Sequence, residues 1–173
     1  MTISEILGVL LYIIIFLSFF VVFFGAPYVP TLSAHMNDMT QLYSFTKRDV
    51  FVDIGCGDGR VLRYVTPKVR KSVGYELSPV VWLIARILSR SHPQIHIYLA
   101  NFWQSSLPRE TTVVYTFLAS HYMPKLQKKL QAHATLHQKP IYLISHGFGF
   151  DNQKPIKTYR SMKLFQFDPL QKA

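Results

Sequence analysis

The sequence predicts a doubly wound, Rossmann-like α/β domain with a mostly parallel sheet, preceded by one transmembrane helix. Three observations support this architecture. Short runs of β-forming residues alternate with helical patterns from Asp49 onward, as in parallel strands joined by right-handed crossovers. A glycine-rich turn from Gly55 to Gly59 separates the first strand from the first helix of that series. An uncharged, apolar segment runs from Ile6 to Phe24.

The segment from Ile6 to Phe24 has the length of a membrane anchor. At 1.5 Å rise per residue it would form a helix of roughly 28 Å, close to the thickness of the hydrocarbon layer. Only Gly8, Tyr12 and Ser18 interrupt its aliphatic and phenyl side chains, so it lacks the polar face of a soluble helix. A cleaved signal peptide is the competing interpretation, but Met1 to Glu5 contains no basic residue and the apolar run is longer than usual.

The chain therefore divides into a transmembrane anchor at residues 1–24, a connector at 25–48 and a globular domain at 49–173. Prolines at the start of the connector prevent the anchor helix from continuing. A short helix is expected within the connector, beginning at Thr31 or Ser33 and ending near Phe45.

The formal net charge is +10, and almost all of it follows the anchor. This asymmetry predicts a single-pass membrane protein whose domain lies on the cytoplasmic or a matrix-like side, with the lipid bilayer as a partner of the anchor. The basic residues are scattered rather than gathered in an aromatic-interleaved run, so no nucleic acid is expected as a partner.

The domain is expected to contain six strands, at residues 50–54, 72–76, 95–99, 112–118, 141–145 and 163–167. Helical patterns occupy residues 60–65, 79–90 and 122–133. Apolar bulk in the second of these helices comes from Val80, Trp82, Leu83, Ala85, Ile87 and Leu88. The segment from Gly147 to Arg160 is rich in Gly, Asn, Gln and Pro, and predicts a long irregular loop.

In a doubly wound sheet, ligands bind beyond the carboxyl ends of the strands. The first strand ends in a G-x-G-x-G turn that follows Asp53, where the missing side chains let the backbone turn sharply and approach a ligand. The spacing differs from the G-x-G-x-x-G of dinucleotide-binding folds, and no G-K-[ST] of a Walker loop follows. Glu76, at the end of the second strand and seventeen positions after Gly59, can accept hydrogen bonds from both ribose hydroxyls.

This pattern resembles the first motif of seven-strand, class I S-adenosylmethionine-dependent methyltransferases. The resemblance implies S-adenosylmethionine as the cofactor, with the turn against its amino-acid part. It also implies that Asn101, after the third strand, holds the adenine amino group through its side-chain carbonyl. The expected cofactor-binding residues are Asp53, Gly55, Cys56, Gly57, Gly59, Glu76, Leu77, Asn101 and Phe102.

Other strings narrow the resemblance. The segment Gly25–Thr31 after the apolar helix, Gly74–Pro79 at the second strand and Tyr122–Leu130 after the fourth are similar to the membrane-anchored lysine methyltransferases. Mitochondrial members of that family modify the ATP synthase c-subunit and the adenine nucleotide translocase. The resemblance implies methyl transfer to a lysine side chain of a membrane or membrane-adjacent protein.

The chain also departs from related methyltransferases. The family often has an acidic residue at the position of Asn101. No Asp-Pro-Pro-Tyr or Asn-Pro-Pro-Tyr box follows the fourth strand, where Phe117 to Ser120 stands instead. The short C-terminal part predicts that the usual final hairpin of the sheet is reduced to one strand.

No catalytic residue is assigned from the sequence. Candidates for an aromatic, dry acceptor pocket are Trp103, Tyr122, His146 and Phe148, and core or rim packing explains each of them equally well. His133 and His137 are four residues apart, but no carboxylate or cysteine joins them, so no metal site is predicted. Cys56 lies within the glycine turn and is not expected to act as a nucleophile.

Two alternatives to a lysine acceptor stay open. A small or lipid-like methyl acceptor would benefit equally from a membrane anchor. A non-catalytic, membrane-bound scaffold or cofactor sensor is the third hypothesis, and the missing Pro-Pro box favours it.

Overall fold

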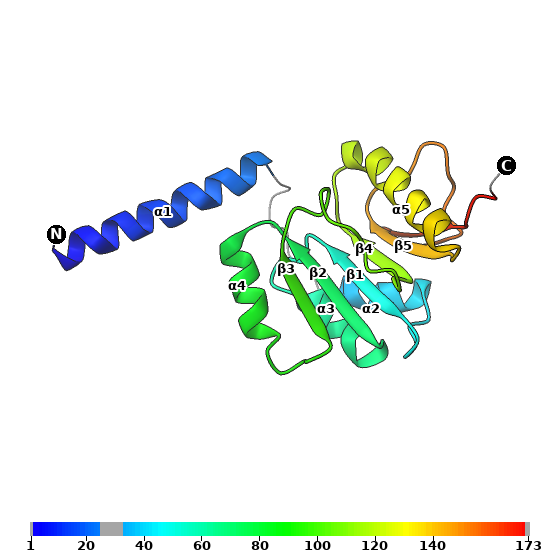
Figure 1. Cartoon of the computed structure of the whole chain (residues 1–173), viewed down its shortest axis with the longest axis horizontal. Coiled ribbons are helices and arrows are strands. Elements are labelled where there is room, and N and C mark those ends of the chain that lie inside the picture. Colours follow the sequence, from blue (N-terminus) through cyan, green and yellow to red (C-terminus); the bar gives the residue numbers. More distant parts are fainter. Residues whose placement is uncertain (1, 25–32, 172–173) are drawn as a thin grey trace.

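A computed structural model of the chain describes residues 2–24 and 33–171, without the side chains of residues 14, 17–24, 33 and 34. A helix, α1 (Ile3–Phe24), extends away from a globular α/β body, as Figure 1 shows. Among the residues that the structure describes, no helix combines the length and apolar character needed to cross a membrane. The backbone of the expected anchor is helical, but much of its side-chain pattern lies outside the described part, as do connector residues 25–32.

The body contains a seven-stranded sheet in the order β3-β2-β1-β4-β5-β7-β6. Its strands are β1 (Val50–Ile54), β2 (Lys71–Glu76), β3 (Ile95–Leu99), β4 (Val113–Thr116), β5 (Ile141–His146), β6 (Lys157–Tyr159) and β7 (Met162–Phe167). The first five strands pair in parallel, and β7 pairs antiparallel with both β5 and β6. The doubly wound, mostly parallel sheet expected from the sequence is therefore confirmed.

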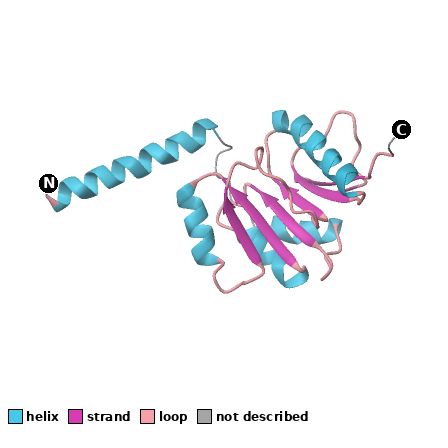
Figure 2. Ribbon diagram, viewed as in Figure 1, coloured by secondary structure: helices cyan, strands magenta, loops and turns pink. Residues whose placement is uncertain are grey.

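Helices cover both faces of this sheet (Figure 2). They are α2 (Ser33–Leu42), α3 (Arg60–Val65), α4 (Pro79–Leu88) and α5 (Met123–His137), with short 3-10 helices at η1 (Thr66–Lys68) and η2 (Ser120–Tyr122). Core residues of α2, α3 and α4 cluster with Phe51 on one face, whereas those of α5 cluster with Val52 on the other. Successive residues of β1 thus enter different layers, which explains why this strand is buried throughout.

The prediction of a single C-terminal strand was wrong. Lys157–Tyr159 forms β6 inside the segment expected to be an irregular loop, and β6 completes the hairpin with β7. All three residues of β6 are exposed, and the strand pairs along one edge only. An exposed edge strand of three residues needs no apolar alternation, so no hydrophobic pattern marks it in the sequence.

Most apolar residues of α4 are exposed, whereas those of a core helix are buried. Of the residues expected to give it bulk, the structure buries Ala85 and half-buries Trp82. Leu83, Ile87 and Leu88 are each about half exposed, at 52%, 52% and 49%. One face of α4 is therefore apolar and faces away from the sheet.

Gly74, in the middle of β2, allows the turn after β1 to pack closely on the sheet. A Cβ atom at Gly74 would lie 2.6 Å from the Cys56 sulfur and 2.7 Å from Leu62 Cδ1. Both neighbours are buried in the same core cluster, so neither has room to move aside. A side chain here would push the glycine turn away from β2.

We expect Gly74→Ala to lower the free energy of unfolding by about 1–3 kcal/mol, because it overpacks the core beneath the turn. Urea denaturation of the full chain would measure the change. In a double mutant, Cys56→Ala should relieve part of the cost, since it removes the sulfur that the new methyl group meets. Equal costs of Gly74→Ala with and without Cys56 would contradict this packing account.

Candidate functional site

The turn after β1 is fixed to the end of β2 by backbone hydrogen bonds. The N–H groups of Gly55 and Cys56 both donate to the Tyr75 carbonyl, at 2.9 and 3.1 Å. Gly55, Gly57 and Gly59 have φ angles of +72°, +56° and +77°, a region that residues with a side chain seldom adopt. The G-x-G-x-G spacing is therefore explained by three left-handed positions in one tight turn.

Glu76 connects the same turn to the start of α4. Its Oε2 accepts a hydrogen bond from Gly57 N–H at 3.0 Å. Its Oε1 accepts from Leu77 N–H at 2.9 Å and from Ser78 N–H at 2.8 Å. The structure thus brings together Gly57, Glu76 and Leu77, three of the residues expected to bind the cofactor.

These contacts leave few acceptor sites on the Glu76 carboxylate for hydrogen bonds to a ligand. A carboxylate has about four lone-pair sites, and backbone amides engage both sites of Oε1 and one of Oε2. One site on Oε2 remains for a ribose hydroxyl. The bidentate ribose contact expected from the sequence would require one of these three amides to release its bond. Burial raises the pKa of Glu76, while the three amide hydrogen bonds lower it.

Two further carboxylates lie close to Glu76. Asp53 is buried, and its pKa is raised well above the ordinary value by burial and by the charges of Glu76 and Asp58. Burial also raises the pKa of Asp58, but hydrogen bonds and the charges of Arg60 and Arg63 outweigh it and lower that pKa overall. The Asp58–Arg60 ion pair is 2.9 Å long. Asp58 is thus already paired with arginines, whereas a cationic amino group placed beside Asp53 would lower the pKa of that carboxyl.

The space next to the turn fits a ligand that approaches the backbone. Among the atoms that the structure describes, none of the heavy atoms lies within 4 Å of a Cβ atom built at Gly55, so the backbone there faces open space in that part of the chain. At the end of β4, the hydroxyl of Thr116 is buried and has no hydrogen-bond partner within the described part of the chain. Thr116 pairs with Ile54, immediately before the turn. An open glycine backbone and an unpaired hydroxyl thus lie at the carboxyl edge of neighbouring strands.

Asn101 and Phe102 begin the loop after β3. The Asn101 side-chain carbonyl already accepts a hydrogen bond from Trp103 N–H at 2.9 Å, and a second lone pair remains for an adenine amino group. Phe102 as a whole is only 5% exposed, and its ring packs against Tyr75, at 5.6 Å between ring centres. The Phe102 ring therefore belongs to the core.

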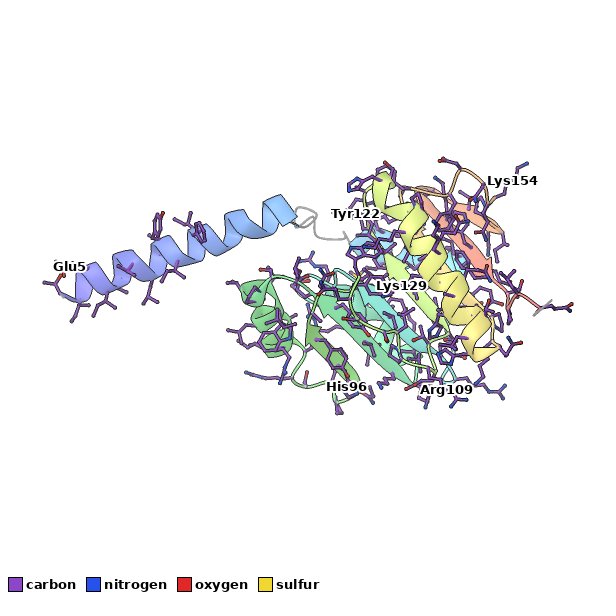
Figure 3. The ribbon with its side chains drawn as sticks, turned by 45° about the horizontal axis from the view of Figure 1, so that its top comes forward. Glu5, His96, Arg109, Tyr122, Lys129 and Lys154 are labelled. Carbon is purple, nitrogen blue, oxygen red and sulfur yellow. The ribbon has the colours of Figure 1, made fainter. Side chains whose placement is uncertain are left out.

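Lys129 of α5 binds the loop after β3, and the sequence analysis did not identify this residue as part of the site. Its ammonium group donates to the carbonyls of Phe102 at 3.0 Å and Ser105 at 2.5 Å (Figure 3 labels Lys129). Burial, together with the charge of Lys125, lowers the pKa of Lys129. A lysine on a polar helix face looks solvent-exposed in a sequence, because its loop partner is more than twenty positions away.

The acceptor-pocket candidates form two separate groups. Trp103 and Tyr122 stack at 5.4 Å between ring centres, and Lys125 Nζ lies 4.8 Å from the centre of the Trp103 ring. The first group is therefore an aromatic pair beside the loop after β3. Phe148, which follows β5, is 42% exposed, and its carbonyl accepts a hydrogen bond from the Ser145 hydroxyl.

His146 belongs to a second group, at the end of β5. The Phe117 ring stacks on it at 4.3 Å, and the His35 ring from α2 packs edge-on at 4.6 Å. The Tyr115 hydroxyl lies 3.5 Å from its Nδ1. Burial and the neighbouring His35 lower the pKa of His146, and Asp38 acts in the opposite direction, so the ring is neutral at pH 7. His35 lies in the connector at residues 25–48, and no sequence pattern around it indicated a site residue.

Three other residues considered from the sequence, His133, His137 and Cys56, lie in packed surroundings. The rings of His133 and His137 pack edge-to-face at 4.5 Å, and burial lowers the pKa of His133 to about 4. Within residues 2–24 and 33–171, no group of three or more His, Cys, Asp or Glu residues is placed to hold a metal ion. Cys56 is buried, and burial together with Asp53 raises the pKa of its thiol well above the ordinary value.

Comparison with known protein families shows the family to which this chain is similar. The family model of the ANTKMT methyltransferase domain matches residues 53–157, from the glycine turn to the start of β6. The chain belongs to this family. Its ANTKMT methyltransferase domain has S-adenosylmethionine as its cofactor, in agreement with the glycine turn and Glu76.

Relatives of this ANTKMT methyltransferase domain carry lysine methyltransferase names. The chain is 31% identical to a lysine N-methyltransferase of the ATP synthase c-subunit from Xenopus laevis, over 75% of this chain and 56% of that protein. It is also 31% identical to a protein-lysine N-methyltransferase of Saccharolobus islandicus, over 76% of this chain and 84% of that protein. The chain thus spans about half the length of the vertebrate relatives that it matches.

The fold of the ANTKMT methyltransferase domain also occurs in solved structures. An RNA methyltransferase from Salinibacter ruber, in complex with S-adenosyl-L-homocysteine, superposes with a TM-score of 0.70 at 22% identity. The match covers 84% of this chain and 97% of that chain. At this identity the likeness concerns the fold, which is the seven-stranded class I methyltransferase architecture.

We expect Glu76→Gln to weaken binding of S-adenosylmethionine by about 10- to 100-fold, because an amide group replaces one acceptor oxygen opposite the backbone donors. Isothermal titration calorimetry of the full chain would measure the affinity. Glu110→Gln is the matched control, since the Glu110 carboxylate is 41% exposed and pairs with Lys71. An unchanged affinity of the Glu76 variant would contradict the assignment.

Lys129→Met should weaken cofactor binding about tenfold, because it leaves carbonyls of the loop after β3 without their charged donor. The same titration would measure it, with thermal unfolding recorded in parallel. Lys128→Met, at the exposed neighbouring position, should bind the cofactor as the parent chain does. If both variants bind alike, Lys129 does not position the loop.

Proposed function

We propose that this chain transfers a methyl group from S-adenosylmethionine to a lysine side chain of a membrane or membrane-adjacent protein. The observation that carries this proposal is the 31% identity to the Saccharolobus islandicus protein-lysine N-methyltransferase, which the match covers over 84% of its length. Vertebrate relatives named for lysine methylation of the ATP synthase c-subunit support a lysine acceptor in the same way.

The membrane setting is part of the same proposal. The uncharged segment from Ile6 to Phe24 supports a single-pass anchor, and α1 gives it a helical backbone. All 19 Lys and Arg residues of the chain, whose net charge is +10, follow this segment, which supports a domain on the cytoplasmic or a matrix-like side. An anchored enzyme would meet acceptors at the surface of its own membrane at a raised local concentration.

When bound, S-adenosylmethionine supplies a methyl group on a positively charged sulfur. The protein's task is to orient the two reactants, and positioning of this kind contributes several kcal/mol to a rate. Glu76 and the amides around it would fix the ribose, while Asn101 and the loop that Lys129 holds would fix the adenine. Asp53, at the end of β1 before the turn, would be the carboxyl group nearest the amino group of the cofactor.

The group around His146 is the better supported acceptor pocket. It combines the flat Phe117 ring with the neutral imidazole of His146 on which that ring stacks. A lysine must lose its proton before it attacks, and a partly buried, aromatic setting favours the neutral amine. Neutral His146 can accept a hydrogen bond from that amine. Trp103 and Tyr122 would then form the rim on the adenine side.

We expect the full chain, incubated with native membranes and S-adenosylmethionine that carries an isotope-labelled methyl group, to label protein rather than lipid. Peptide mass spectrometry should place the label on lysine side chains of membrane proteins. His146→Gln should lower this labelling at least tenfold while cofactor affinity changes little, because the variant alters the acceptor side alone.

The control is the Glu76→Gln chain, which should transfer little label at the same cofactor concentration. Label recovered only in the lipid fraction would replace the lysine acceptor with a lipid-like one. Cofactor binding without transfer to any membrane component would contradict an enzymatic role and favour a scaffold.

A further inference from the structure

One face of α4 is apolar and has no partner in the described part of the chain. It consists of residues at helical spacing, each between 37% and 52% exposed: Val80, Leu83, Ile84, Ile87 and Leu88. We refer to these five residues as the α4 face. Helices of globular domains turn such a stripe towards the core, whereas α4 turns it towards the surroundings. A contiguous apolar face of this kind marks an interaction site.

A basic cavity lies beside the α4 face. It has a volume of about 480 Å³ and is formed by the C-terminal half of α4, the following turn and β3. Its lining includes Arg86, Arg90, His92 and His96, and no acidic residue contributes to it. Arg86 and Arg90 are exposed. Two guanidinium groups with two imidazoles are the chemistry that binds a phosphate.

The location of α4 connects these features to the N-terminal helix. In Figures 1 and 3, α4 is the helix of the body on the side from which α1 extends. Figure 3 labels His96, on the strand next to α4. An apolar helix face, a basic cavity and the apolar α1 therefore belong to one side of the molecule. The net charge of +10 draws the chain as a whole towards anionic lipid.

We propose that the α4 face lies in the boundary between headgroups and acyl chains of an anionic membrane, with the basic cavity holding a phospholipid phosphate. The inference rests on the membrane attachment proposed above and adds the surface by which the domain lies on that membrane. Apolar side chains with arginines at their border are the composition of a helix that binds a membrane interface.

A second copy of the chain fits this surface less well. A symmetric contact between two α4 faces would bring Arg86 and Arg90 of both copies into one interface, where like charges repel. An anionic lipid surface complements the same arginines. Charge therefore favours lipid over a second copy as the occupant.

The arrangement also orients the cofactor site. Helix α4 begins directly after Glu76, with Ser78 as its N-terminal cap, so the first turn of the α4 face adjoins the cofactor-binding edge. With α4 in the interface, that edge lies beside the headgroups. Lysines that flank a membrane-spanning segment would then be within reach, whereas lysines far from the bilayer would not.

The test places a fluorophore at single cysteines of the full chain. Three variants are compared, each labelled at one position: Ile87→Cys on the α4 face, Leu136→Cys on α5 and Leu10→Cys on α1. Leu136 is a matched control, because it is an apolar residue, 76% exposed, on the opposite side of the sheet. Native Cys56 is buried, and the unaltered chain measures any labelling at that position.

The labelled chains are reconstituted into vesicles of phosphatidylglycerol and phosphatidylcholine that contain a spin-labelled phospholipid as quencher. We expect quenching at position 87 to exceed that at position 136 by about threefold or more, and quenching at position 10 to be strong. Arg86→Gln with Arg90→Gln, or vesicles of phosphatidylcholine alone, should reduce the quenching at position 87 several-fold without affecting position 10.

Each alternative gives a different result. Quenching at position 10 but equal, weak quenching at 87 and 136 would overturn this inference and leave the anchor intact. Absence of quenching at position 10 as well would overturn the membrane attachment itself. Efficient disulfide cross-linking in the vesicles between two unlabelled Ile87→Cys chains, through the cysteines introduced at position 87, would overturn the inference in favour of a second copy.

Discussion

The Glu76 carboxylate accepts hydrogen bonds from the backbone amides of Gly57, Leu77 and Ser78, and this contact sets the geometry of the whole carboxyl edge. It joins the turn after β1 to the start of α4, two segments that chain connectivity alone would leave independent. A half-buried carboxylate with three charge-assisted bonds defines where a ribose can lie. The left-handed φ angles of the turn are stable because the turn is held in this way.

Packing beneath the turn reinforces the same contact. Gly74 leaves room for Cys56 and Leu62, so the turn lies directly on β2. On the adenine side, Lys129 performs a comparable role for the loop after β3, with an ammonium group in place of a carboxylate. The site is thus built from loops at three strand ends, each tied to the rigid sheet by a buried or half-buried group. This explains how a small domain with few helices can hold a flexible cofactor.

The sequence predicted the parts of this structure that rest on local patterns. Short runs of β-forming residues located β1 and β3 to the residue, and the alternating glycines located the turn. Lys129 and His35 were missed because their partners are distant in sequence, and β6 was missed because an exposed edge strand has no apolar pattern. The exposed face of α4 could not be foreseen, since an apolar stripe in a sequence looks the same whether core or membrane covers it.

The most direct test of the cofactor site is amide hydrogen exchange of the full chain with and without S-adenosylmethionine. We predict that added protection is confined to residues 55–59, 76–78 and 101–103, with the Gly57 amide among the most strongly protected because the bound ribose encloses its contact with Glu76. Protection centred elsewhere, or no change at Gly57, Leu77 and Ser78 at saturating cofactor, would contradict the account.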